Sequence, residues 1–361
     1  MDKVVILGAG RIGRRIAGLL RDRAQAVLLD HDPAKLDLAK AAGLPAEALP
    51  PGVGREALRR ALTGATALIV VEAVLPSADL VALACEAGCH YLDLNESDAS
   101  AKDVARAAKG APGHLRFAPG CGLAPGYVTA LLAEEIARAP RSAEITAYVG
   151  VLPITPVNRL GYANIWGVPG LLQEYTRPVI GLRGGQVAAS APLGDYEALT
   201  IDGIALEAFS TAGSIDALAR AREGQVQGLS FKTLRYPGHL EYMLFLLDDL
   251  GLRQQLHRLT SLLMTSLPAT EADRVVIALR SVAGAGSRPR WITRQYVASP
   301  DSGSAMATLA AAHTVAMLDH MQSSAAIGPV LMPGDTSLDD LRRSPAFALL
   351  EQAAPHHPVP A

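Results

Sequence analysis

The feature that most constrains this sequence is a glycine motif near its N-terminus, Gly8-Ala9-Gly10-Arg11-Ile12-Gly13. A β-branched run, Lys3–Leu7, precedes the motif and apolar residues at helical spacing follow it, which is the context of a dinucleotide-binding turn. The first glycine permits the tight turn, the second lets the backbone approach a pyrophosphate, and the third lets the helix pack against the strand. The motif therefore predicts a Rossmann domain with cofactor-binding residues Gly8, Gly10, Arg11, Ile12 and Gly13. An ordinary glycine-rich turn is the alternative.

Asp30 is expected to select between the two nicotinamide cofactors. It ends the second expected strand, Ala26–Leu29, about 20 residues beyond the glycines. A carboxylate at this position accepts hydrogen bonds from the adenosine ribose hydroxyls and repels a 2′-phosphate. No arginine follows immediately, so the sequence favours NAD over NADP. Glu72 and Ala73, which follow the next strand of the expected βαβ series, are expected beside the cofactor ribose.

Strands and helices alternate along the first third of the chain. Amphipathic helices separate the expected strands, which indicates an α/β fold with a doubly wound parallel sheet. This rhythm ends at the glycine- and proline-rich segment Ala118–Gly126. Beyond it, β-like runs such as Glu144–Val151 and Leu199–Phe209 mix with helices. We therefore expect a Rossmann NAD-binding domain over residues 1–122 and an α+β domain for substrate binding and dimerisation over residues 123–300.

Composition and charge exclude several kinds of partner. The 361 residues carry a formal net charge of −2 without a basic block, which argues against nucleic acid. No apolar run reaches the roughly 18–20 residues of a membrane span, so no membrane is expected. The three cysteines, Cys85, Cys89 and Cys121, do not form a metal-ligand set with His90. No metal is therefore expected, and a reducing, cytoplasmic setting fits these thiols.

Five segments occur in a fixed order in the second domain: CGLAPG (121–126), GVLPITPVNRLGY (150–162), LLQEYTRPV (171–179), LEAFSTAG (206–213) and KTLRYPGHLE (232–241). Together they resemble the saccharopine dehydrogenase-like family, and most closely its lysine 6-dehydrogenase branch. The resemblance implies an α+β second domain whose open, largely antiparallel sheet faces the cofactor. It also implies that a helix within residues 301–325 returns to the Rossmann domain. Residues 326–361 form a C-terminal extension, and its proline-rich end, from Ala354, is expected to be disordered.

The resemblance also implies the chemistry. Members of the family interconvert an amine C–N bond and an imine with NAD(P). Lysine 6-dehydrogenases oxidise the ε-carbon of L-lysine to a semialdehyde, which cyclises to a piperideine carboxylate. Saccharopine reductases commonly carry an acid where this chain has Ala124, which weakens saccharopine as the substrate. The loop after Leu152-Pro153 also departs from the family pattern, and its Arg159 either influences substrate choice or is a solvated loop cation.

Amine oxidation requires a proton acceptor and an anion clamp. An ammonium has no lone pair to assist hydride departure, and the amino-acid carboxylate suits a bidentate arginine. His239, near a helix start, and Asp93, at the end of its strand, are the candidate acceptors, with a structural hydrogen bond or helix cap as the alternative for each. Cys121 is expected to line the nicotinamide pocket. The candidate substrate-binding residues are Arg235, Arg177, Tyr175, Glu207 and Arg159, although the first two could instead pair with acids in the fold.

These observations favour an NAD-dependent amino-acid dehydrogenase that deaminates the L-lysine side chain oxidatively. One alternative is the reductive condensation of an amino acid with a carbonyl compound, as in saccharopine or carboxynorspermidine formation. The other is a catalytically silent NAD-binding redox sensor. The apolar hairpin of residues 274–297 and the Ala/Met-rich helix Ser304–Met321 indicate a homodimer, since such faces are often buried between subunits.

Overall fold

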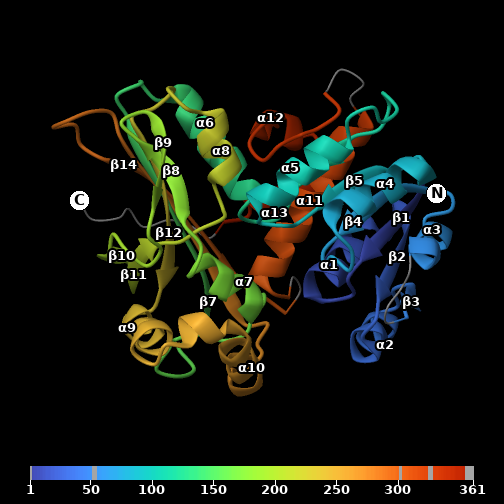
Figure 1. Ribbon diagram of the computed structural model, residues 1–361, viewed down its shortest axis with the longest axis horizontal. Helices are drawn as coiled ribbons and strands as arrows, with labels where there is room; N and C mark the ends of the chain where they lie inside the picture. The colour runs from blue at the N-terminus through green and yellow to red at the C-terminus, as the bar shows by residue number, and fades with distance from the viewer. Residues whose placement is uncertain (1, 51–54, 301–302, 324–327, 354–361) are drawn as a thin grey trace. The chain divides into compact units, whose positions relative to one another are not determined.

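The computed structural model describes residues 2–50, 55–300, 303–323 and 328–353, and these form two compact units (Figure 1). The first unit comprises Met1–Leu131 with Ala307–Glu351, and the second comprises Leu132–Met306 with Gln352–Ala361. Each unit is built around its own sheet. The predicted disordered end, residues 354–361, lies outside the described residues.

The first unit contains a six-stranded parallel sheet with the strand order β3-β2-β1-β4-β5-β6. This is the doubly wound order of dinucleotide-binding domains, so the predicted Rossmann fold is confirmed. Its strands are β1 (Asp2–Leu7), β2 (Ala24–Asp30), β3 (Ala46–Ala48), β4 (Ala65–Val70), β5 (His90–Asp93) and β6 (Phe117–Ala118). The connecting helices are α1 (Arg11–Leu20), α2 (Pro33–Ala41), α3 (Arg55–Ala61), α4 (Ser77–Ala87) and α5 (Asp98–Ala107).

Helices cover both faces of this sheet because its strands are apolar on both sides. On one face, Val5, Leu29 and Val70 share a buried cluster with residues of α3, α4 and α5. Helix α1 packs against the other face, where an added Cβ on Gly13 would lie 3.4 Å from the Leu28 side chain. This double layer fixes where α1 begins relative to the end of β1.

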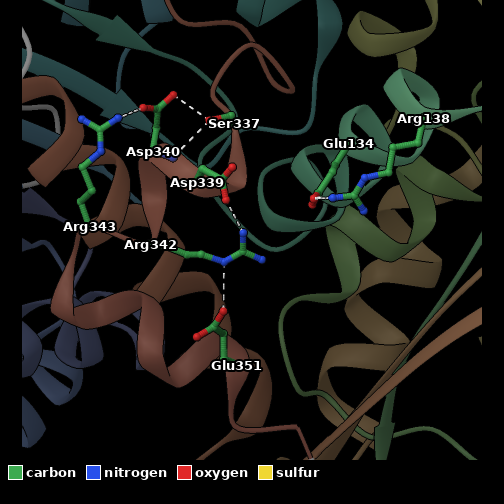
Figure 2. A network of polar contacts seen from close by, with 8 residues as sticks. All are labelled: Glu134, Arg138, Ser337, Asp339, Asp340, Arg342, Arg343 and Glu351. Atoms are coloured by element: carbon green, nitrogen blue, oxygen red, sulfur yellow. Dashed lines mark hydrogen bonds and ion pairs between the residues drawn. The ribbon is translucent and has the colours of Figure 1, made fainter.

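The end of the chain contributes to the first unit through α12 (Leu338–Leu341), α13 (Ala348–Glu351) and all but the first two residues of α11 (Ala305–Ser323), which belong to the second unit. Helix α11 is buried along almost its whole length, so it does not offer a free dimer face as the sequence had suggested. Ser337 caps α12, and Arg342 bridges Asp339 and Glu351, as Figure 2 shows. The same figure shows the pair of Glu134 and Arg138, one turn apart on α6 (Tyr127–Arg138).

The second unit contains an eight-stranded sheet in which β7 and β12 are parallel and the other paired strands are antiparallel. The predicted α+β domain with a largely antiparallel sheet is thus confirmed. Its strands are β7 (Glu144–Pro153), β8 (Val179–Arg183), β9 (Gln186–Ser190), β10 (Glu197–Ile201), β11 (Ile204–Ser210), β12 (Gly228–Arg235), β13 (Asp273–Val282) and β14 (Arg290–Val297). Its helices are α7 (Val168–Glu174), α8 (Asp216–Ala221), α9 (His239–Leu244) and α10 (Leu256–Ser266).

This second sheet is strongly curled. The Tyr148 hydroxyl in β7 donates a 3.0 Å hydrogen bond to Glu197 in β10, although β12 and β11 lie between these strands in the sheet order. The ring of Tyr148 also packs 5.5 Å from that of Trp291 in β14. The concave face therefore encloses its own apolar cluster, while residues of α7 and α10 form a second cluster with Phe209.

Two details of the expected elements are corrected. The run Leu199–Phe209 is not one strand but parts of two, because Asp202 and Gly203 adopt positive φ values of 50° and 77° and form a tight turn. Strands β8 and β9 form a further hairpin, which the sequence pattern did not predict. In the part of the chain that the structure describes, none of the helices is long and apolar enough to span a bilayer.

Candidate active site

The glycine turn has the geometry that a dinucleotide pyrophosphate requires. Gly8 has a φ of +111°, where a side chain would be strained, and an added Cβ would lie 3.1 Å from the Glu72 amide nitrogen. A Cβ on Gly13 would lie 1.9 Å from the Gly8 carbonyl oxygen, so only glycine lets α1 pack this closely. A Cβ on Gly10, in contrast, would meet nothing within 4 Å, which leaves its backbone open to a ligand. The first turn of α1, with Arg11 and Ile12, starts directly after it.

Asp30 is fixed beside this turn. Its Oδ2 accepts a 2.7 Å hydrogen bond from the Ala9 amide, and its Oδ1 accepts one of 2.9 Å from the Asp32 amide. Each oxygen keeps a second lone pair, which suits ribose hydroxyls. Glu72 and Ala73 lie exposed in the loop after β4. The first unit thus brings the predicted cofactor residues together and fits a nicotinamide dinucleotide.

Asp93 and Cys121 are linked to each other in the interior of the first unit. The Asp93 carboxylate is 1% exposed and accepts hydrogen bonds from the Gly120 amide, the Asn95 amide and the Tyr91 hydroxyl. Burial raises the pKa of Asp93 in spite of these donors. Its backbone oxygen accepts from the Cys121 amide. This geometry favours the structural hydrogen-bonding alternative for Asp93 over the role of a proton acceptor open to substrate.

The Cys121 side chain has the features of an inert thiol. It is 2% exposed, and its Sγ donates to the Ala118 carbonyl oxygen at 3.2 Å. Burial raises the pKa of Cys121 well above its usual range, so the nucleophilic thiolate is disfavoured. His313 Nδ1 and the Thr314 hydroxyl hold the Cys121 carbonyl oxygen at 2.8 Å and 3.0 Å. The residue therefore anchors its loop to α11 within the first unit.

In the second unit, three predicted site residues meet in one buried network. Arg235, at the end of β12, donates from Nε to the Tyr175 hydroxyl at 3.0 Å, and that hydroxyl lies 3.0 Å from Nε2 of His239. His239 Nδ1 lies 2.9 Å from the Leu160 carbonyl oxygen. A carbonyl oxygen only accepts, so Nδ1 carries the proton and Nε2 accepts from Tyr175. The chain of donors runs from Arg235 through Tyr175 to His239.

His239 is therefore neutral and fully engaged. Burial, together with the charge of Arg235, lowers its pKa to about 3. The ring is 0% exposed and is stacked on Phe209, with 6.3 Å between ring centroids. A neutral imidazole was expected at this helix start, but both of its nitrogens are already bonded within the protein. The geometry thus favours the structural hydrogen-bonding alternative for His239.

Glu207 orients the turn that carries His239. Its carboxylate is 4% exposed and accepts hydrogen bonds from the Gly238 amide at 3.0 Å and the Leu240 amide at 2.6 Å. These are the amides at the start of α9, so Glu207 caps that helix from the neighbouring strand β11. Glu207 is therefore a buried helix-capping residue and not a solvent-exposed strand acid.

Arg235 is a buried cation in an unusual setting. The side chain is 2% exposed, its guanidinium lies 5.3 Å from the centre of the Tyr162 ring, and Nη1 donates to the Leu234 carbonyl oxygen. Burial opposes its charge, but Tyr175, Tyr162 and Glu174 raise the pKa of Arg235, so it stays protonated. Of these three groups only Glu174 is a carboxylate, and it is itself buried. Neither Tyr162 nor Leu160, which complete this network, was among the predicted site residues.

Arg177 and Arg159 do not join the network. Arg177 is half-buried, and its Nε lies 3.3 Å from the Gln173 carbonyl oxygen within its own segment. Arg159 is exposed, as a solvated loop cation would be. Their roles in substrate binding stay predictions. Among the residues that the structure describes, no three His, Cys, Asp or Glu side chains are grouped so that they could hold a metal ion.

The second unit also holds a pocket of about 340 Å³ at the N-terminal ends of β7 and β12. Lys232 lines it, and this ammonium donates to the Asp195 carbonyl oxygen and pairs with Glu197. Arg235 lies at the opposite, C-terminal end of β12. The pocket is therefore separate from the network that the sequence predicted.

Both parts of the chain match known families. Residues 4–113 match the saccharopine dehydrogenase NADP binding domain, and residues 122–335 match the saccharopine dehydrogenase C-terminal domain. The apo, histidine-tagged saccharopine dehydrogenase (L-Glu forming) from Saccharomyces cerevisiae is 16% identical over 97% of both chains, with a TM-score of 0.75. Homospermidine synthase from Legionella pneumophila, solved with NAD, is 11% identical over 97% of this chain and 89% of its own, with a TM-score of 0.70. At these identities the structural likeness establishes the fold.

Proposed function

The chain belongs to the saccharopine dehydrogenase family, and on that premise we propose that it is a nicotinamide-dependent oxidoreductase acting on a C–N bond of an amino acid. The first candidate reaction is oxidative deamination of the L-lysine side chain, as in lysine 6-dehydrogenases. The product would be a semialdehyde that cyclises to a piperideine carboxylate.

The observation that carries this proposal is the buried guanidinium of Arg235. A buried guanidinium is costly, and Glu174 compensates its charge only through space, so a substrate carboxylate would supply an anion in direct contact with it. Arginine binds carboxylates in a planar, bidentate geometry that also orients the ligand. Tyr175 holds Arg235 through Nε, which leaves Nη2 without a described protein acceptor. We assign Arg235 as the carboxylate clamp and Tyr175 as the residue that positions it.

The amine must be neutral before it can be oxidised. A lysine ε-ammonium has a pKa of about 10.4 in water. Since Nε2 of His239 is already bonded to Tyr175 and the Asp93 carboxylate is buried, we propose that the substrate amine loses its proton to solvent. Bound NAD supplies the hydride acceptor, and we propose NAD rather than NADP because Asp30 suits ribose hydroxyls. Turnover is accordingly expected to rise towards alkaline pH.

The test follows NADH formation with the purified chain across a panel of diamino acids and polyamines, with NAD and with NADP. We expect turnover with L-lysine and NAD. Replacing Arg235 with Met should raise KM for the amino acid far more than KM for NAD, and Arg235→Lys should recover part of the loss. The matched control is Arg183→Met in β8, whose side chain is exposed. An equal effect of Arg235→Met on both KM values would refute the clamp.

The second candidate is reductive condensation, which the family itself favours because saccharopine is a secondary amine. In that case free amines would give no turnover, and NADH would be consumed when a keto acid or aldehyde is added with an amine. The same panel therefore separates the two reactions.

We further propose a cytoplasmic homodimer. The three free thiols support a reducing compartment. The sequence predicts two dimer faces, α11 and the hairpin β13–β14. Because α11 is buried, we propose that the dimer forms through the hairpin, whose strand β14 is an edge strand of the sheet. Light scattering of the purified chain measures the oligomeric state.

A further inference from the structure

Three charged side chains meet beside the glycine turn. Lys35 Nζ in α2 lies 2.8 Å from Glu72 Oε2 and 3.8 Å from Asp30 Oδ2. Asp30 is held by two backbone amides, and the Glu72 backbone lies directly against Gly8. The fold therefore fixes the Asp30 carboxylate and the Glu72 backbone, and the Lys35 ammonium lies within reach of both carboxylates.

With Lys35 so close, Asp30 alone does not explain a preference for NAD over NADP. A carboxylate at the end of β2 repels the 2′-phosphate of NADP, but an ammonium 3.8 Å away is a common phosphate ligand in proteins. Asp30, Glu72 and Lys35 together carry one net negative charge, and Asp32 adds another nearby, at the strand end where dinucleotide-binding domains hold the adenosine ribose. The balance against NADP thus depends on Glu72 as well as on Asp30.

The pair of Lys35 and Glu72 can exchange partners. Their side chains are 32% and 50% exposed, and ion pairs at such positions contribute little to stability. Burial lowers the pKa of Lys35, but Glu72, Asp30 and Asp32 outweigh this effect and raise it, so the ammonium stays charged. A doubly charged phosphate in the same place would compete with a single carboxylate for it.

We infer that Lys35 is a latent ligand for the 2′-phosphate of NADP, and that Glu72 keeps it occupied and thereby determines cofactor choice. This inference rests on the proposed binding of a dinucleotide at the glycine turn. It assigns the specificity to an ion pair that bridges α2 and the loop after β4, not to Asp30 alone.

The test is calorimetric titration of the purified full chain with NADH and with NADPH, which does not depend on turnover. In Glu72→Gln, the ratio of NADPH affinity to NADH affinity is expected to rise about tenfold, the order of one charge-assisted hydrogen bond. Adding Lys35→Met to this variant should abolish the gain. His31 lies 3.6 Å from Asp30, so Glu72→Gln with His31→Asn should retain the gain if Lys35 is the ligand.

The matched control is Lys40→Met, an exposed cation at the end of the same helix, which should leave both affinities unchanged. A gain that survives Lys35→Met, or an unchanged ratio of NADPH to NADH affinity in Glu72→Gln, would overturn the inference while leaving the cofactor site intact. If the wild-type chain binds neither dinucleotide, the proposed function fails together with it.

Discussion

At the scale of single residues, the donor chain through Arg235, Tyr175 and His239 contributes to the loss of stability in acid through His239. His239 has a folded-state pKa of about 3, below the roughly 6.5 of an unfolded histidine. A base with a depressed folded pKa binds more protons when unfolded, so its contribution is present above pH 6.5 and is lost as the pH falls towards 3.

We therefore expect the stability difference between the wild type and His239→Gln to shrink by roughly 3 kcal/mol between pH 7 and pH 4.5. Glutamine offers a donor and an acceptor but does not titrate. Urea denaturation at both pH values measures the difference. His257→Gln, at an exposed position, is the control and should leave the pH dependence as it is. Parallel pH profiles for the wild type and His239→Gln would contradict this account.

Some residue roles could be predicted from the sequence and others could not. The glycines and Asp30 act through backbone conformation and position in one βα unit, and such local effects follow from sequence spacing. The partners of Arg235 could not be predicted in this way, because Tyr175 is 60 residues away and Leu160 lies in another loop. The chemistry that amine oxidation requires predicts Arg235, Tyr175 and His239 as site residues, but the direction of each hydrogen bond required the structure.

At the scale of elements, the β10–β11 hairpin depends on one glycine. Gly203 has a φ of +77°, so Gly203→Ala should lower the free energy of unfolding by about 1 kcal/mol through strain in the turn. Gly18→Ala in α1 is the contrasting control, since a Cβ there meets nothing within 4 Å and should stabilise the helix. Urea denaturation of both variants measures the effects. If both substitutions change the free energy of unfolding in the same direction, the turn assignment is refuted.

Helix α11 is capped by a residue from a distant strand. The Asp273 carboxylate is 0% exposed and accepts from the Ser304 hydroxyl and from the Ala305 and Met306 amides at 2.9, 2.6 and 3.0 Å. Asp273→Ala should cost at least about 2 kcal/mol, because three buried donors lose their acceptor. Asp273→Asn keeps one oxygen and should cost less. Denaturation midpoints compare the two, and a neutral Asp273→Ala would show that water satisfies these donors.

These elements show where local signals suffice and where they fail. The dipeptide Asp202-Gly203 is a strong turn signal, so the sequence contains the information for the hairpin although its β-like composition alone predicts one continuous run. The capping of α11 was not readable, because the sequence shows Ser304 at the helix start but gives no sign that Asp273 faces it. Contacts between residues so far apart depend on how β13 lies in the sheet.

At the scale of the whole molecule, the chain carries separate probes for its two units. All three cysteines lie in the first unit, where Cys89 and Cys121 are buried. Both tryptophans, Trp166 and Trp291, lie in the second. Thiol labelling therefore follows unfolding of the Rossmann unit, and tryptophan fluorescence follows unfolding of the unit with the curled sheet.

This division makes the proposed cofactor site testable without a substrate. A ligand that binds only the folded state stabilises it by about 2.7 kcal/mol at a concentration of 100 times Kd. If NADH binds through the glycine turn and Asp30, it should protect Cys89 and Cys121 from labelling in urea by this amount. The tryptophan transition should shift less, because the second unit has its own apolar clusters and can unfold separately. Asp30→Ala is the control and should reduce the protection. Equal shifts of both probes would mean instead that the two units unfold as one cooperative structure. If neither probe shifts, NADH does not bind to the first unit.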